Sequence, residues 1–290
     1  MPLFLYSTIH PFIRSESMRK VCVITGGGSG IGLATAKILG EKNDVIIVGR
    51  TAKKLESALD QLRTLGISAE ALECDISDRS AVDHLAAIAR SRGTITAVVH
   101  AAGMSPHMGD GETIMKVNAL GTINVNESFY EVMEEGSCIV DISSMSAYLT
   151  PGFILPKRKY KYSRINIEVF MKKMMSRVNL FPQSLRSSVA YGISKHFVIW
   201  YAKMDAAKFG QKGIRVISIS PGSFETPMGE LEKDEVNECL KHSAIKRLGR
   251  AEEIADLIAY CTSDKASYLT GTDILCDGGC VASGYNPLKR

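Results

Sequence analysis

Residues 21–32 have the sequence VCVITGGGSGIG, and the segment that follows carries apolar residues at helical spacing. An apolar, β-branched run that ends in glycines and passes directly into a helix predicts a strand, a tight loop and a helix. Such a loop lets backbone approach a pyrophosphate and places it at the helix N-terminus, where free N–H groups point outward. The sequence therefore predicts a dinucleotide site. The expected contacts are Gly26, Ser29, Gly30, Ile31 and Gly32.

The alternation of strand-like and helix-like segments continues along the chain. Further apolar, β-branched runs lie at residues 45–49, 97–101, 138–143 and 214–220. Apolar residues at helical spacing occur at 31–42, 52–65, 79–92, 112–134, 190–209 and 251–263. Strands that are apolar on both faces and linked through helices predict a parallel sheet covered on both sides. The predicted fold class is therefore α/β, a single doubly wound parallel sheet.

Composition narrows the class of protein. The 290 residues are 45% hydrophobic and 23% charged, and the net charge of +4 is too small to predict nucleic-acid binding. No run of about 18 uncharged apolar residues occurs, so no membrane span is expected. Seven cysteines in a chain of this length predict reduced thiols and a cytoplasmic location. Cys276 and Cys280 lack a second Cys or His pair, so no metal site is predicted.

The end of the second predicted strand favours one nicotinamide cofactor. This strand end carries Gly49, Arg50 and Thr51. The first acidic residue after it is Glu56. An acidic side chain at this point suits the ribose hydroxyls of NAD, whereas a guanidinium suits a 2′-phosphate. We therefore expect NADP(H), with Arg50 and Thr51 among its contacts. A solvated strand end is the alternative interpretation of Arg50, and use of both cofactors stays open.

Tyr191 and Lys195 form a Tyr-x-x-x-Lys pair at the start of the helix expected at 190–209. This spacing places a phenol and an ammonium on one helix face. A free phenol, with a pKa of about 10, is a poor base near neutral pH, and a neighbouring ammonium is expected to lower that pKa. Tyr191 is therefore the predicted acid/base. In the other such pair, Tyr285 and Lys289, an intervening proline would break the helix.

The T-G-x-x-x-G-x-G loop and the Tyr191/Lys195 pair together resemble the short-chain dehydrogenase/reductase family, from Arg19 to about Ser283. The resemblance implies a Rossmann fold, with one NADP(H)-binding domain at 19–290 after a loose N-terminal extension at 1–18. It implies that Ser144 orients the substrate oxygen, that Lys195 contacts the nicotinamide ribose and that Asn118 supports a lysine-linked water. The further cofactor contacts that it implies are Asp75, Ile76, Ala102, Gly103, Pro221, Gly222 and Thr226.

The chain departs from the family pattern at three points. His100 and Ala101 stand where the family has two asparagines, and we expect His100 to face cofactor and sheet rather than act as a general base. The connection from Gly103 to Asn118 is short, and residues of about 149–187 form an insertion before the catalytic-tyrosine helix. We expect the insertion to lie near the pocket mouth. This combination loosely resembles the 3α-hydroxysteroid dehydrogenase/carbonyl reductase branch.

The insertion is strongly basic. Residues 151–190 hold nine basic side chains and one acidic side chain, Glu168. They include a helical stretch with Val169, Phe170, Met174 and Val178 at amphipathic spacing. A lid or subunit-contact element is the favoured interpretation. Docking of an anionic substrate and contact with a membrane surface stay open.

These features predict an NADP(H)-dependent oxidoreductase that interconverts a ketone and a secondary alcohol. The expected substrate is a small molecule, either a steroid or bile acid or another bulky apolar carbonyl compound. The alternatives are a 3-oxoacyl thioester reductase and a non-catalytic NADP(H)-sensing protein. The resemblance implies a homo-oligomer, dimer or tetramer, with no nucleic-acid partner.

Overall fold

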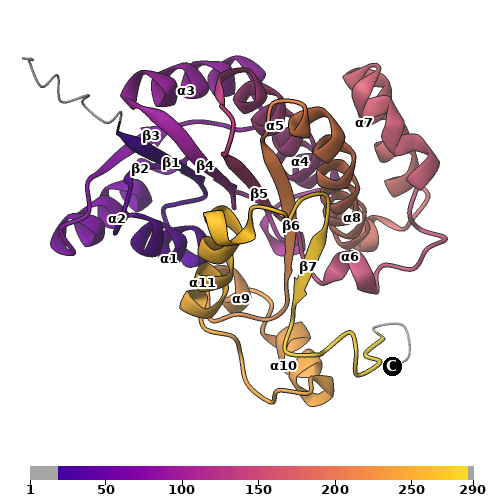
Figure 1. The fold of residues 1–290 in the computed structure, drawn as a ribbon. Helices are drawn as coiled ribbons and strands as arrows, with labels where there is room; N and C mark the ends of the chain where they lie inside the picture. Colours follow the sequence, from indigo (N-terminus) through magenta and orange to yellow (C-terminus); the bar gives the residue numbers. More distant parts are fainter. Residues whose placement is uncertain (1–18, 287–290) are drawn as a thin grey trace, which may run out of the picture.

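The computed structural model describes residues 19–286, so the extension expected at 1–18 and the residue Lys289 lie outside it. A seven-stranded parallel sheet of order β3-β2-β1-β4-β5-β6-β7 forms the centre (Figure 1). Its strands are β1 (Lys20–Thr25), β2 (Asp44–Gly49), β3 (Ala69–Glu73), β4 (Thr94–His100), β5 (Cys138–Ile142), β6 (Arg215–Pro221) and β7 (Asp273–Cys276). The order reverses between β1 and β4, and this confirms the predicted doubly wound sheet.

Helices cover both faces of the sheet because alternate strand residues point to opposite sides. One face, which includes Ile24, Ile47 and Ile217, packs against α1 (Gly30–Leu39), α2 (Ala52–Thr64) and α11 (Ala251–Thr262). The other face, which includes Val23, Val98 and Val216, packs against α3 (Arg79–Arg92), α5 (Gly121–Val132) and α8 (Gln183–Gly210). The carboxyl ends of the strands stay free to form a site at the reversal of strand order.

Two helices differ from the sequence expectation. The segment expected at 112–134 is α4 (Gly111–Met115) and α5, joined by a π-helical turn at Lys116–Leu120. The helix expected at 190–209 begins at Gln183, directly after Pro182. Its first residues are exposed, so they show no apolar periodicity from which the start could be predicted.

The insertion is an ordered part of the fold. It forms a 3₁₀ helix (Lys157–Arg164) and α7 (Ile167–Val178), which packs against α4 and α8. Tyr160 is fully buried and its ring lies 5.4 Å from Phe197 and 5.7 Å from Trp200, centroid to centroid. Of the predicted amphipathic positions, Val169 faces outward, whereas the other three are buried.

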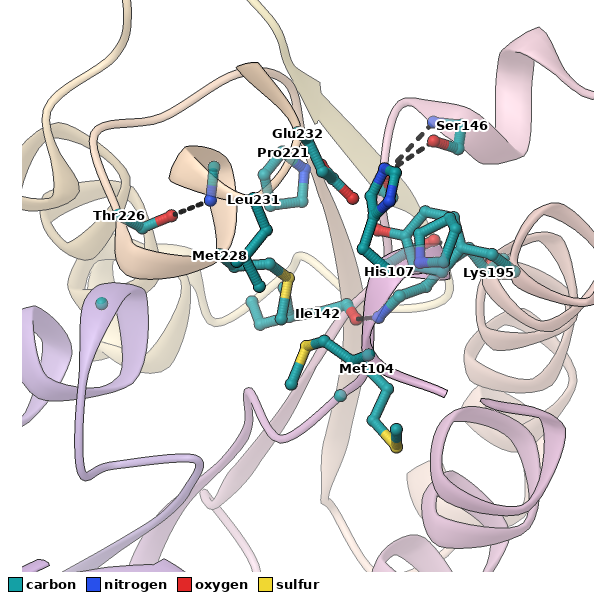
Figure 2. A pocket seen from close by; sticks show the side chains of 18 of the residues that line it. Met104, His107, Ile142, Ser146, Lys195, Pro221, Thr226, Met228, Leu231 and Glu232 are labelled. Atoms are coloured by element: carbon teal, nitrogen blue, oxygen red, sulfur yellow. Dashed lines mark hydrogen bonds between the residues drawn. The ribbon is translucent and has the colours of Figure 1, made fainter. Parts of the chain in front are cut away.

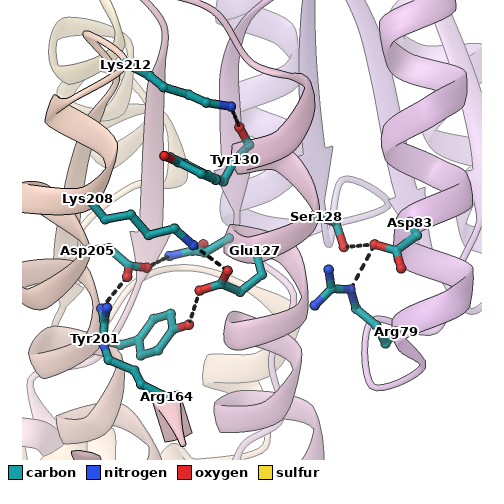
Figure 3. A network of polar contacts seen from close by, with 11 residues as sticks. Arg79, Asp83, Glu127, Ser128, Tyr130, Arg164, Tyr201, Asp205, Lys208 and Lys212 are labelled. Carbon is teal, nitrogen blue, oxygen red and sulfur yellow. Dashed lines mark hydrogen bonds and ion pairs between the residues drawn. The ribbon is translucent and has the colours of Figure 1, made fainter.

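A polar network fixes the insertion to α8 (Figure 3). Arg164 forms an ion pair with the buried carboxylate of Asp205 and lies 5.2 Å from the centroid of the Tyr201 ring. Glu127 of α5 accepts hydrogen bonds from Tyr201 at 3.0 Å and from Lys208 at 2.5 Å. These contacts join the insertion, α5 and α8 into one layer.

Three short helices lie near the carboxyl ends of β5 and β6. They are α6 (Ser146–Leu149), α9 (Pro227–Glu230) and α10 (Lys233–His242). Within residues 19–286, no helix combines the length and the apolar character needed to cross a bilayer.

Candidate active site

The glycine loop after β1 has the geometry of a phosphate cradle. Gly26 and Gly30 adopt φ angles of +70° and +53°, a conformation that favours glycine. A Cβ atom on Gly32 would lie 2.4 Å from the Gly26 carbonyl oxygen, so only glycine fits. The first turn of α1 contains no acidic residue, so its N–H groups and dipole suit an anion. Ser29 and Ile31 line the same cavity, and the loop fits a dinucleotide pyrophosphate.

Basic side chains lie at the end of β2. Arg50 is exposed, lines the cavity and places Nη2 3.9 Å from Sδ of Met104. Thr51 and Lys54 line the same cavity, and Lys54 also lies beside the glycine loop at Gly28. Lys54 was not predicted from the sequence. It lies in the first turn of α2, where the helix dipole disfavours positive charge, and a cation at such a position could have indicated a bound anion.

Two of the predicted cofactor contacts lie in the turn after β3, and only one of them lines the cavity. Cys74 and Ile76 line the cavity. The Asp75 carboxylate is not part of the wall, because it accepts hydrogen bonds from the backbone N and the Oγ of Ser77 at 2.9 and 2.7 Å. Ile76 is therefore brought to the cavity, whereas the Asp75 side chain closes its own turn.

The turn after β4 brings the backbone close to the catalytic groups. Ala102 and Gly103 line the cavity, and Ala102 N donates to Thr25 Oγ1 at 3.2 Å. A Cβ atom on Gly103 would lie 3.2 Å from both Asn118 Oδ1 and Lys195 Nζ. A larger residue at position 103 would therefore press on both side chains.

His100 is part of the sheet rather than of the proton-transfer chemistry. It is buried, and its Nδ1 lies 2.8 Å from Thr25 Oγ1. Burial lowers the pKa of His100 to about 3, and the positive charge of Lys195 adds to the effect. The ring is therefore neutral near pH 7 and a poor proton acceptor.

Three predicted catalytic side chains meet in the cavity. Ser144 follows β5, and Tyr191 and Lys195 lie one turn apart on α8. The Ser144 hydroxyl accepts from Ser146 N at 3.1 Å. Lys195 Nζ lies 5.9 Å from the Tyr191 ring centroid and donates to the Ile142 carbonyl oxygen at 2.9 Å. Figure 2 shows Lys195 and Ile142 joined at the base of the cavity.

The expected lowering of the Tyr191 pKa is wrong for this structure. Burial raises the pKa of Tyr191, the Glu232 carboxylate raises it further, and only the Ser144 hydroxyl lowers it. Burial also lowers the pKa of Lys195 to about 8. Desolvation is the largest cause of both shifts, because burial disfavours the charged form of a phenol and of an ammonium. Tyr191 is therefore protonated near neutral pH and suited to donate a proton.

Asn118 lies in the π-helical turn and holds the loop after β4. Its Oδ1 accepts from Met104 N at 2.8 Å, and its Nδ2 donates to the Met104 carbonyl oxygen at 3.0 Å and to Ser194 Oγ at 3.2 Å. The Asn118 carbonyl oxygen accepts from Thr122 at 2.7 Å. The side chain therefore fastens the Met104 loop to α8.

The segment after β6 closes a further side of the cavity. Pro221, Gly222 and Thr226, three of the predicted cofactor contacts, line it. Thr226 Oγ1 accepts from Gly229 N at 3.2 Å and so caps α9 (Figure 2). A Cβ atom on Gly30 would lie 3.4 Å from Thr226, so α9 begins beside the glycine loop.

The cavity that joins these groups has a volume of about 780 Å³. Its wall beyond Tyr191 is largely apolar, and part of it comes from the insertion. The insertion and the start of α8 contribute Phe153, Ile154, Phe181 and Leu185. Three further lining residues were not predicted from the sequence. Leu231 and Glu232 come directly before α10, and Glu235 lies in it. No periodicity or motif marks these positions, because they reach the cavity only through tertiary packing.

Comparison with family models gives two matches along the chain. A model described as short chain dehydrogenase matches residues 20–179. A model described as enoyl-(acyl carrier protein) reductase matches residues 168–281.

Individual proteins match most of the chain. A short-chain dehydrogenase/reductase, bsc3, of Alternaria brassicicola is 31% identical over 265 residues, which is 90% of this chain and 95% of that protein. The 3-oxoacyl-[acyl-carrier-protein] reductase FabG of Thermotoga maritima is 27% identical over 275 residues, 90% and 98% of the two chains. Among solved structures, a short chain dehydrogenase from Burkholderia cenocepacia in complex with NADP is similar, with a TM-score of 0.72 and 25% identity. That likeness covers 90% of this chain and 98% of the other.

Proposed function

This chain belongs to the short chain dehydrogenase family, and we propose that it interconverts a ketone and a secondary alcohol with NADP(H) as its hydride carrier. One observation carries the proposal. Ser144, Tyr191 and Lys195 meet in the same cavity that begins at the glycine loop. An acid, a hydrogen-bonding hydroxyl and an ammonium beside a dinucleotide cradle are the groups that carbonyl reduction requires.

The choice of NADP(H) is supported by charge at the end of β2. Arg50 and Lys54 both line that end of the cavity, and no acidic residue lies between β2 and Glu56. A guanidinium recognises a phosphate through several N–H groups, whereas an NAD ribose is usually held by a carboxylate. The similar Burkholderia structure, which is a complex with NADP, adds support.

Each catalytic side chain has a proposed role. When bound, NADPH supplies hydride to the carbonyl carbon. The Tyr191 hydroxyl donates the proton that the carbonyl oxygen gains, and the Ser144 hydroxyl holds that oxygen. Lys195 places a positive charge beside the developing alkoxide and contacts the ribose, while Asn118 keeps the loop after β4 in place and supports the proton path.

The apolar wall favours a bulky carbonyl substrate. A steroid or bile-acid ketone matches the apolar character of the wall beyond Tyr191, which includes Ile154, Phe181 and Leu185. A 3-oxoacyl thioester is the second candidate, supported by the enoyl-(acyl carrier protein) reductase model and by the similarity to the Thermotoga enzyme.

Turnover of NADPH with a panel of ketones and 3-oxoacyl thioesters tests the proposal, with NADH assayed alongside. We expect NADPH-dependent reduction of at least one substrate class and a loss of about 100-fold or more in Tyr191→Phe, because the proton donor is removed. Binding of NADPH by the variant, followed by fluorescence, controls for folding. Tight NADPH binding without turnover of any substrate would instead favour a cofactor-sensing protein.

A further inference from the structure

The charged side chains that line the cavity are divided by sign. Arg50 and Lys54 lie at the dinucleotide end, and Lys195 lies beside Tyr191. Beyond Tyr191, the charged wall residues are Glu232 and Glu235, with the titratable His107 facing them.

The basic insertion adds no positive charge to this wall. Its nine basic residues between 151 and 190 are all absent from the cavity lining, and its contribution there is uncharged. Arg164 is paired with Asp205, and Arg177 donates to the carbonyl oxygens of Phe153 and Ile154. The substrate end of the cavity is therefore apolar and acidic, although the surrounding segment is basic.

Glu232 is placed so that its charge reaches the catalytic groups. It precedes α10 but makes no side-chain cap to that helix, and its side chain extends into the cavity toward His107 (Figure 2). Glu232 lines the same cavity as Tyr191 and Lys195, and its carboxylate raises the pKa of both.

Glu232 and Glu235 differ in their pairing. Glu235 Oε1 lies 3.4 Å from His107 Nε2. Glu232 is half-buried, burial raises its pKa, and within residues 19–286 no cation lies close enough to form an ion pair with it. The charges of His107 and Lys195 lower that pKa without forming an ion pair, and they offset only part of the desolvation of the carboxylate.

A ligand can supply the missing compensation. A cationic group in the cavity would pair with Glu232 in a partly desolvated site, where charge-assisted hydrogen bonds are strong. An anionic group would be repelled by both carboxylates. We propose that the substrate is an apolar ketone, or the corresponding alcohol, that carries a protonated amine, and that Glu232 is its counter-ion and a specificity-determining residue.

This inference rests on the proposed function and narrows its substrate class. It places bile-acid carboxylates, acyl carriers and CoA phosphates among the poorer substrates, because their negative charges would approach Glu232 and Glu235. Neutral ketones of similar shape are substrates without the added attraction.

Pairs of ketones that differ only by an amine nitrogen in place of a carbon test the inference. N-Benzylpiperidone and benzylcyclohexanone are one such pair, and open-chain amino ketones with their carbon isosteres extend the set. With NADPH, we expect kcat/KM to favour the amine member of the best pair by about tenfold or more. In Glu232→Gln, which keeps the side-chain shape, this ratio should fall close to one.

Glu238→Gln is the matched control, because Glu238 lies on α10, pairs with Lys241 and does not line the cavity. We expect this variant to keep the wild-type ratio. Turnover of neutral ketones with no amine preference, or a preference that survives in Glu232→Gln, would overturn the inference and leave the proposed function intact. No turnover of any pair member by a wild-type protein that does reduce steroid ketones or 3-oxoacyl thioesters would overturn the inference alone, and no turnover in either panel would overturn both.

Discussion

Ser143 and Ser144 are neighbours on the chain with identical side chains, and the structure gives them different partners. The Ser143 hydroxyl donates to the Lys195 carbonyl oxygen at 2.8 Å, so it joins β5 to α8. The Ser144 hydroxyl accepts from Ser146 N at 3.1 Å, and it lowers the pKa of Tyr191. Residue chemistry could not separate the two serines, and the choice of Ser144 from the family pattern stays a prediction.

Arg50 is expected to determine cofactor preference. Arg50→Ala should lower kcat/KM for NADPH by about tenfold or more and change the NADH value little, because only NADPH carries the 2′-phosphate. Steady-state kinetics with both cofactors measure the change. Lys53→Ala is the control, since Lys53 is a nearby cation in the first turn of α2 that does not line the cavity. Equal losses with both cofactors would contradict the proposed role.

Asp141 is expected to make stability depend on pH. It is fully buried on β5, and Asn126 donates to its Oδ2 at 3.0 Å. Burial raises the pKa of Asp141 to about 7, and the nearby carboxylate of Asp205 adds to the effect. The unfolded carboxyl group has a pKa of about 4, so the folded state binds more protons between these values. The free energy of unfolding should therefore fall as pH rises from about 4 to about 7.

The variant Asp141→Asn isolates this contribution. It should stabilise the protein relative to wild type increasingly as pH rises from 5 to 8, by up to about 4 kcal/mol, because a neutral amide avoids the buried charge. Denaturant unfolding at several pH values measures the difference. A stability difference that does not change with pH would refute the assignment.

At the scale of elements, the insertion has two kinds of apolar residue. Tyr160 is fully buried against the aromatic side chains of α8. Phe153 is 70% exposed and lines the cavity mouth. The first kind joins the insertion to the core, whereas the second shapes the access of substrate.

Substitution by alanine should affect stability differently at the two kinds of position. Tyr160→Ala should lower the free energy of unfolding by about 3 to 5 kcal/mol, because it leaves a cavity between the insertion and α8. Phe153→Ala should change stability by less than about 1 kcal/mol and mainly raise KM for bulky ketones. Chemical denaturation and kinetics distinguish them, and similar stability losses in both variants would argue against this division.

At the scale of the whole molecule, the sheet brings two halves of the chain to one cavity. The glycine loop, Arg50 and the turn after β4 come from the first half, and Tyr191, Lys195 and the α10 segment come from the second. They meet because parallel strands direct all their carboxyl ends to one edge, on either side of the reversal between β1 and β4.

The proposed domain organisation predicts that the first residues are dispensable. A chain that starts at Met18 should keep its melting temperature within about 2 °C and its turnover with NADPH, because β1 begins at Lys20 and pairs in register with β2 and β4. Thermal unfolding and kinetics of the two chains check this expectation. A large loss in either would mean that residues 1–17 contribute to the fold or the site.

Sequence alone determined the sheet, the glycine loop and the Tyr191/Lys195 pair, because each depends on residues close together in the chain. Apolar β-branched runs, glycines at a strand end and a four-residue spacing carry their physical consequences locally. Other features were decided only by tertiary structure: the burial that raises the pKa of Tyr191, the turn that withdraws Asp75, and the placement of Glu232 against the reacting groups. They depend on which distant segments pack together and exclude water, and that is a property of the folded chain as a whole.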